Sequence, residues 1–158
     1  QFGTAAVFAA TMLSLATVAS AQDKPAKATA PSSAGKSLTW GPASDVFSAG
    51  AKMAVERGDP TKPGEFVVRL SFPAGYKIPP HWHPTDEHVT VISGSFGIGI
   101  GDTFDKSKVR YLPAGSYVRL GKEERHYAIT KGETVIQVHA MGPFEIHYVS
   151  PADDPRKK

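Results

Sequence analysis

The stretch Gly75-Tyr-Lys-Ile-Pro-Pro-His-Trp-His-Pro-Thr-Asp-Glu-His-Val-Thr-Val-Ile-Ser-Gly94 combines strand signals with side chains of the kinds that bind metals. His81 and His83 lie two residues apart, so in a β-strand both side chains project from the same face. Pro84-Thr85-Asp86 predicts a turn, after which Glu87 opens a second strand beside the first. Such a hairpin places one carboxylate next to two imidazoles.

A third imidazole is placed far along the chain, where His126 opens another predicted strand after the tight connection of residues 121–125. Three neutral imidazoles and one carboxylate suit first-row transition metals rather than calcium or magnesium. Four protein ligands on an ion that prefers six leave about two positions for water, oxygen or substrate. We therefore expect one divalent transition-metal ion per chain, with iron, manganese or copper favoured and zinc or nickel as alternatives. A metal-free interpretation treats these residues as unrelated histidines and a glutamate.

The chain on either side of this stretch consists of short apolar runs separated by turn residues. Its 158 residues include fifteen Gly and thirteen Pro, and no amphipathic helix is evident. Strands are predicted at 52–57, 65–72, 77–83, 87–93, 95–101, 109–112, 116–120, 126–130, 134–140 and 144–149. About ten strands at this spacing indicate an all-β antiparallel sandwich or barrel.

Two motifs in the chain resemble those of the cupin family. Gly75-x5-His81-x-His83-x3-Glu87-x6-Gly94 matches the first cupin motif at every position and spacing. The second motif, usually Gly-x5-Pro-x-Gly-x2-His-x3-Asn, is present only in part. Gly115 and His126 stand at its separation, whereas its Pro, second Gly and Asn are replaced by Gly121, Glu123 and Thr130. The resemblance covers residues 37–150.

The resemblance implies a jelly-roll barrel, the double-stranded β-helix of cupins, as a domain over residues 37–150. In that fold the metal lies inside the barrel near one mouth, and the family's ligands correspond to His81, His83, Glu87 and His126. Cupins often pair through their outer sheets, so the resemblance also implies a homodimer. The chain contains no Asn, so the oxalate-type cupins that place Asn side chains near the metal are a poor match.

Strand alternation offers further candidates for the cavity. With Glu87 pointing inward, Val89 and Val91 face inward too and His88 faces outward. Gln137 and His139 lie on one face of the predicted strand 134–140. They either point into the cavity or lie on an exposed outer face. Glu123 and Glu124 either lie near the mouth of the cavity or belong to a solvated turn, and we favour the turn. The candidates for second-shell or substrate-pocket residues are Gln137, His139, Thr130 and Tyr76.

The two ends of the chain differ in composition from its body. Residues 1–21 carry no charge and end in Ala19-Ser20-Ala21, which predicts a secretory signal peptide and a periplasmic or secreted protein. This segment lacks an initiator Met and a basic start, so we expect it to be truncated; a buried N-terminal helix is the alternative. Residues 22–36 predict a disordered, flexible tether. Residues 151–158 form a polar tail that we expect to fray.

Charge and cysteine content exclude several classes of function. The net charge is +3, but residues 37–151 carry twelve basic and twelve acidic residues. This neutral body has no evident basic surface that could bind a phosphate backbone, which argues against nucleic acid as a partner. The absence of Cys excludes disulfides, thiolate metal sites and thiol nucleophiles. No apolar run reaches the roughly eighteen residues of a membrane-spanning helix, so no membrane insertion is expected after signal cleavage.

The sequence leaves three functions open. The first is a metal-dependent oxidoreductase, of oxidase or dioxygenase type, that acts on a small molecule or a carbohydrate. The second is a non-catalytic periplasmic module that binds a metal or a small ligand. The third is a metal-dependent isomerase or lyase. A sugar-handling cupin with a degenerate metal site is disfavoured because the ligand set is complete.

Overall fold

The structure is a computed structural model that describes Gly3 and residues 37–158. The predicted signal peptide and tether, residues 1–21 and 22–36, otherwise lie outside the described residues. Eleven strands make up the described body: β1 (Gly41–Pro42), β2 (Lys52–Arg57), β3 (Gly64–Phe72), β4 (Lys77–Trp82), β5 (Glu87–Ser93), β6 (Ser95–Ile100), β7 (Arg110–Pro113), β8 (Tyr117–Leu120), β9 (His126–Thr130), β10 (Thr134–Gly142) and β11 (His147–Tyr148).

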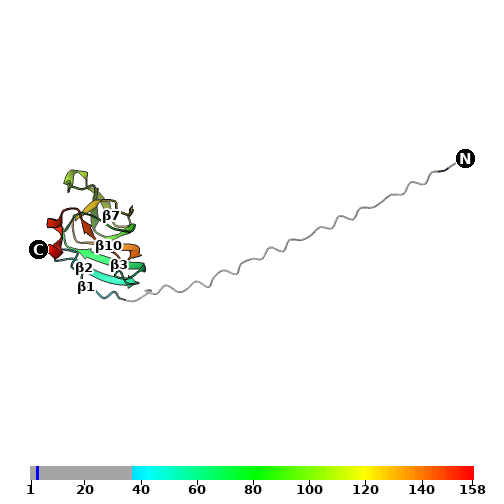
Figure 1. The fold of residues 1–158 in the computed structure, drawn as a ribbon, viewed down its shortest axis with the longest axis horizontal. Coiled ribbons are helices and arrows are strands. Elements are labelled where there is room, and N and C mark those ends of the chain that lie inside the picture. The colour runs from blue at the N-terminus through cyan, green and yellow to red at the C-terminus, as the bar shows by residue number, and fades with distance from the viewer. Residues whose placement is uncertain (1–2, 4–36) are drawn as a thin grey trace. The chain divides into compact units, whose positions relative to one another are not determined.

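The strands form two antiparallel sheets, as predicted for a jelly-roll barrel. One sheet has the order β1-β2-β3-β10-β5-β8, and the other has the order β11-β4-β9-β6-β7. Strands β3 and β10, distant in the sequence, lie side by side along their whole lengths (Figure 1). Each sheet therefore joins strands from both halves of the domain, and this brings His126 beside the hairpin that carries the other three candidate ligands.

Alternating apolar residues on the inner faces form the core. In β3 every second side chain is buried, because Phe66, Val68, Leu70 and Phe72 face the other sheet. Around Phe72, the rings of Tyr76 and Phe96 lie at centroid distances of 4.9 and 6.3 Å and fill one end of the barrel. The core at this end is closed by aromatic packing, and the polar candidate site lies elsewhere in the barrel.

The predicted strand at 144–149 is shorter in the structure, where only His147 and Tyr148 pair with β4. The residues before them pack inward instead. The amide of Phe144 donates a hydrogen bond to the carbonyl oxygen of Pro60 over 2.8 Å, and its ring packs edge-on against Phe66. Ile146 is also buried. Long-range packing therefore replaces strand pairing in this segment.

The outer face of β6 carries glycines because another side chain lies directly on it. A methyl group added at Gly99 would overlap the ring of Tyr127, a side chain that is fully buried. The Tyr127 hydroxyl donates a hydrogen bond to the carbonyl oxygen of Asp105 over 3.0 Å. The connection between β6 and β7 thus covers this part of the second sheet.

The polar tail does not fray as expected. It forms two short 3-10 turns, η2 (Pro151–Asp153) and η3 (Pro155–Lys157). Asp154 between them is buried and accepts hydrogen bonds from Arg156, which also donates to the carbonyl oxygen of Ile146. These polar contacts hold the tail against the barrel. Among the described residues, no helix has the length and apolar character needed to cross a membrane.

Candidate metal centre

The four predicted ligands come from three strands and meet inside the barrel. His81 lies in β4 and His83 directly follows that strand, while Glu87 and His126 are the first residues of β5 and β9. All four side chains are buried. His81 pairs with His126 across the β4–β9 ladder, so the two halves of the chain are joined at the site itself. One nitrogen from each imidazole lies within 4.8 Å of the corresponding nitrogens of the other two.

Each imidazole is oriented by a backbone carbonyl. The Nδ1 atoms of His81, His83 and His126 lie 2.7, 2.8 and 2.9 Å from carbonyl oxygens. A carbonyl oxygen can only accept, so each Nδ1 carries the proton and each Nε2 keeps its lone pair. The three carbonyls belong to Pro79, Glu145 and Glu124. Fixing the tautomer from behind is how proteins prepare histidines to bind a metal.

The carboxylate of Glu87 completes the set. Its Oε2 lies 3.5 Å from Nε2 of His83 and 3.5 Å from Nε2 of His126. The Nε2 atom of His83 is buried and has no hydrogen-bond partner among the described residues. Leaving a buried polar atom without a partner costs free energy unless something else binds it. A divalent cation bound to these four residues would satisfy it, so the donor set fits a single transition-metal ion.

The protonation states of the ligands also suit a cation. Burial and the adjacent imidazoles hold the pKa of His81 well below 6.5, and burial lowers the pKa of His83. Burial raises the pKa of Glu87, but its interactions with His83, His126 and His81 outweigh burial and hold that pKa at about 2. Burial likewise opposes protonation of His126, yet its hydrogen bond and attraction to Glu87 raise its pKa. The site thus presents a carboxylate and the imidazole lone pairs of His81 and His83, while His126 interacts with Glu87.

The turn before β9 holds the two motifs together. The amide of Glu123 donates a hydrogen bond to the carbonyl oxygen of His83 over 2.9 Å. Glu123 has a φ of 61°, a left-handed conformation that favours glycine. This is the position at which the second cupin motif has its glycine, so Glu123 adopts here a conformation that glycine adopts freely.

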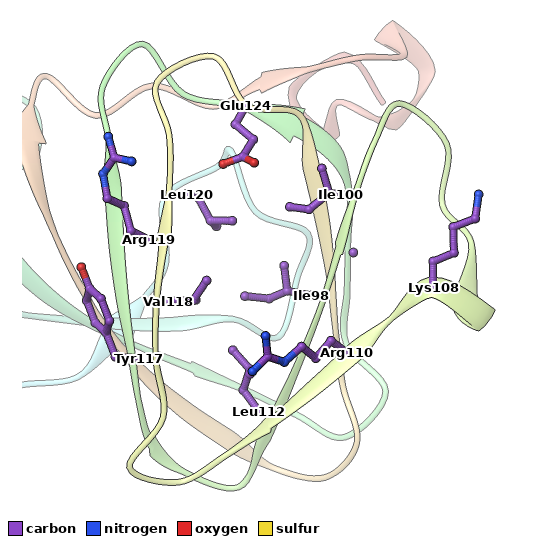
Figure 2. Close-up of a pocket in the computed structure, with 11 residues that line it drawn as sticks. Ile98, Ile100, Lys108, Arg110, Leu112, Tyr117, Val118, Arg119, Leu120 and Glu124 are labelled. Carbon is purple, nitrogen blue, oxygen red and sulfur yellow. The ribbon is translucent and has the colours of Figure 1, made fainter.

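A pocket of about 490 Å³ opens beside the centre, between the edge strands β7 and β8 (Figure 2). Its apolar walls are Ile98, Ile100, Leu112, Val118 and Leu120, and its charged residues are Lys108, Arg110, Arg119 and Glu124. Leu120 pairs directly with Glu87, and Ile100 pairs directly with His126. Directly opposed side chains on one face of a sheet are neighbours, so two lining residues neighbour Glu87 and His126, although none of the four predicted ligands itself lines the pocket.

Two of the predicted pocket residues lie on the outer face of the first sheet. His139 is exposed and its Nε2 lies 2.8 Å from Oε1 of Glu65, while Gln137 shares its face on β10. Their neighbours Ile136, Val138 and Ala140 are buried instead. The expectation that Gln137 and His139 line the cavity is therefore wrong, because β10 turns its apolar face inward. His88, cross-strand from His139, faces outward as predicted.

The other two predicted pocket residues are structural. Thr130 is four residues along β9 from His126, which corresponds to about 13 Å. Its hydroxyl donates to the carbonyl oxygen of Pro73 over 2.6 Å and accepts from the amide of Tyr76. The Tyr76 hydroxyl donates to the carbonyl oxygen of Ser48. Both residues fasten the aromatic end of the barrel, so neither is a second-shell or pocket residue.

Sequence reasoning did not identify Lys108, Arg110 or Arg119 as pocket residues. Glu124, for which we favoured a solvated turn over the cavity mouth, lines the pocket, and its Oε2 accepts a hydrogen bond from the amide of Gly121 over 2.7 Å. Arg110 lines the same pocket from β7. The available signal was the alternation in residues 110–112, which places Arg110 on the same face as Leu112.

Comparison with known proteins agrees with this architecture. The family model of a domain of unknown function, DUF4437, matches residues 23–147. The chain belongs to this family. DUF4437 is a cupin-like family, so the resemblance stated from the two motifs is confirmed. No curated protein matches the chain.

Two solved structures resemble this DUF4437 cupin in fold. The polyketide cyclase RemF from Streptomyces resistomycificus has a TM-score of 0.57 and 17% identity, over 68% of this chain and 76% of that one. An RmlC-like cupin from Shewanella frigidimarina NCIMB 400 has a TM-score of 0.50 and 18% identity, over 61% of this chain and 80% of that one. At these identities the likeness establishes the cupin fold alone.

Proposed function

We propose that this DUF4437 cupin is a metal-dependent enzyme that carries out oxygen-linked oxidative chemistry on a small organic molecule. The observation that carries the proposal is that a candidate metal site and a pocket lie next to each other. Three buried imidazoles converge on one point, with the Glu87 carboxylate 3.5 Å from two of them, and a pocket of about 490 Å³ is lined by the strand neighbours of Glu87 and His126. A volume of this size is typical of small-molecule sites. A metal-dependent isomerase or lyase would use the same metal site and pocket.

His81, His83, Glu87 and His126 would hold the metal. A bound iron, manganese or copper ion would supply a redox centre and open positions for oxygen and substrate. The backbone carbonyls of Pro79, Glu145 and Glu124 keep the three imidazoles aligned. With the ligands fixed in this way, little reorganisation is required when substrate binds.

The pocket residues supply the surroundings that the reaction needs. The apolar side chains of Ile100 and Leu120 line the pocket beside His126 and Glu87, with Leu120 buried and Ile100 exposed. Glu124 is the carboxylate that lines the pocket without belonging to the ligand set. In the proposed reaction its side-chain oxygens accept or return a substrate proton.

Metal reconstitution followed by oxygen measurement tests this proposal. Metal-free protein is reloaded with iron(II), manganese(II), copper(II) or zinc(II), and oxygen consumption is followed with a panel of small organic acids, phenols and sugars. We expect consumption with one of the redox-active metals and none with zinc. Turnover without oxygen consumption would favour isomerase or lyase chemistry.

A non-catalytic binding module is the second candidate, and one observation favours it. Apart from the four ligands, the buried polar residues among those described are Thr130, Thr134 and Asp154, so no additional buried base stands beside the centre. A saturated, inert site with no turnover for any metal in the same experiment would support this candidate and contradict the enzyme.

Secretion and dimerisation remain proposals that can be tested directly. We propose that residues 1–21 direct export to the periplasm or medium, which predicts a mature N-terminus near Gln22 in the exported protein. We also propose a homodimer, which light scattering after gel filtration measures. A mature chain that retains residues 1–21, or a monomer at all concentrations, would contradict the respective proposal.

A further inference from the structure

We propose that the pocket beside the metal centre binds a small organic acid, with one carboxylate on an apolar body, and that Arg110 pairs with that carboxylate. The inference rests on the proposed function, because it names the substrate class of the same site. It follows from the position, the charge state and the surroundings of Arg110.

Arg110 lies on the edge strand β7, where it is exposed and lines the pocket. In the β6–β7 ladder, Phe96 pairs with Leu112 and Ile98 pairs with Arg110. Phe96, Ile98 and Leu112 are all buried in the core. Since directly opposed side chains share a face, Arg110 belongs to the same inner face, and Figure 2 shows its side chain beside Leu112 in the pocket. Leu112 is buried on this face, whereas Arg110 is exposed, so its guanidinium is open both to solvent and to a ligand in the pocket.

No partner for Arg110 is present among the described residues. The neighbouring cations form ion pairs elsewhere. Nζ of Lys108 lies 3.5 Å from Oδ2 of Asp105, and Nη2 of Arg119 lies 2.6 Å from Oδ2 of Asp86. Arg110 forms no ion pair within that part of the chain. The planar guanidinium matches a carboxylate with two parallel hydrogen bonds. The pocket thus holds one positive charge that is available to an anionic ligand.

The pocket is polarised along its length. Ile100 and Leu120 mark the end next to the metal ligands, and Ile98, opposite Arg110, is two residues farther along β6, which corresponds to about 7 Å. Glu124 carries a negative charge in the same pocket, which disfavours a second carboxylate. A ligand with its carboxylate on Arg110 would therefore present an apolar chain or ring, and then a reacting group, to the centre.

The test compares two probes with the same carbon skeleton, 3-phenylpropanoate and 3-phenylpropanamide. Binding to the zinc-loaded full chain is measured by titration calorimetry, for the unaltered protein, Arg110→Gln and the control Arg57→Gln. Arg57 is an exposed arginine on β2 that lies 3.8 Å from Glu65, outside the pocket. We expect the carboxylate to bind the unaltered protein and the control alike, and Arg110→Gln about ten- to a hundredfold more weakly.

The outcomes separate this inference from the proposed function. Equal affinity for carboxylate and amide, an unchanged affinity in Arg110→Gln, or no binding of either probe would overturn the inference. Carboxylate selectivity that depends on Arg110 would support it even if the reconstituted enzyme consumed no oxygen. Conversely, oxygen-linked turnover with no dependence on Arg110 would support the function and overturn the assignment of substrate class.

Discussion

The amide of Glu123 donates a hydrogen bond to the carbonyl oxygen of His83 over 2.9 Å, and this bond joins the turn before the last histidine ligand to the strand end that carries the second. The backbone of Glu123 is left-handed, with a φ of 61°. The bond is made by the main chain, so it survives changes of side chain at residue 123, and what such changes alter is the cost of the left-handed conformation.

Replacing Glu123 with glycine should stabilise the domain relative to replacing it with alanine. The left-handed conformation costs an L-residue about 1–2 kcal/mol, whereas glycine adopts it freely. Glycine loses about 0.5–1 kcal/mol of this gain through its larger freedom in the unfolded chain. We expect Glu123→Gly to exceed Glu123→Ala by up to about 1 kcal/mol in free energy of unfolding measured in urea. If the alanine variant were the more stable, the left-handed turn would be excluded.

Removing a predicted ligand should abolish metal binding. His81→Ala and His126→Ala each delete one donor from a site with no spare ligand. We expect metal per chain, measured by elemental analysis after reconstitution and dialysis, to fall at least about tenfold. The matched control is His88→Ala, because His88 faces outward and contacts Tyr117. Full metal content in either ligand variant, or equal loss in the control, would contradict the assignment.

Gly99 should not tolerate a side chain. A methyl group there would overlap the buried ring of Tyr127, and overpacking of this kind typically costs about 1–3 kcal/mol. Gly132 is the control, since nothing lies within 4 Å of a methyl group added there. Thermal unfolding should show a clear loss for Gly99→Ala and a change within about 0.5 kcal/mol for Gly132→Ala. Equal melting temperatures would place Tyr127 elsewhere.

The contribution of Asp154 to stability should depend on pH. Hydrogen bonds from the Arg156 side chain hold the pKa of Asp154 below its ordinary value of 3.8, although burial opposes this shift. A carboxyl whose pKa is lower in the folded chain than in the unfolded chain stabilises the fold above the unfolded value, and this contribution is lost as pH falls through the folded value. Asp154→Asn should therefore lower the urea midpoint at pH 7.

Measurements on the unaltered chain and on Asp154→Asn at several pH values test whether the charge of Asp154 is responsible. The difference in urea midpoint between the unaltered chain and Asp154→Asn should shrink steadily as the pH falls below 4. A difference that stayed constant from pH 7 to the acid limit would show that the carboxylate charge plays no part. Metal content at pH 7 should also be compared, because Arg156 bonds Ile146, the residue after the Glu145 carbonyl that orients His83.

Much of the fold, and the meeting of His81, His83 and His126, could be predicted from strand alternation and motif spacing. Alternation placed Glu87, Val89 and Val91 inside and His88 outside, and the structure agrees. For β10 the same alternation left two faces to choose from, and the polar face with His139 proved to be the outer one. The apolar character of Ile136 and Val138 carried the information that decides it.

The pocket could not be predicted in this way. It is formed by β6, β7 and β8, and its position depends on the pairing of β7 with β6 in one sheet and of β8 with β5 in the other. Alternation along a strand says which residues share a face, but not which faces from two sheets meet across a gap. Arg110 becomes significant only when its neighbours Lys108 and Arg119 are seen to be paired elsewhere.

The hydrogen bond from His83 to the Glu145 carbonyl has a consequence for the order of events during biosynthesis. A chain is made from its N-terminus, so the hairpin that carries His81, His83 and Glu87 leaves the ribosome long before residue 145. Until that late segment is in place, the ring of His83 lacks the acceptor that fixes its tautomer. A chain that has not yet been extended to residue 145 therefore lacks the acceptor behind His83, and we expect the three imidazoles to be aligned only after the last strand has been made.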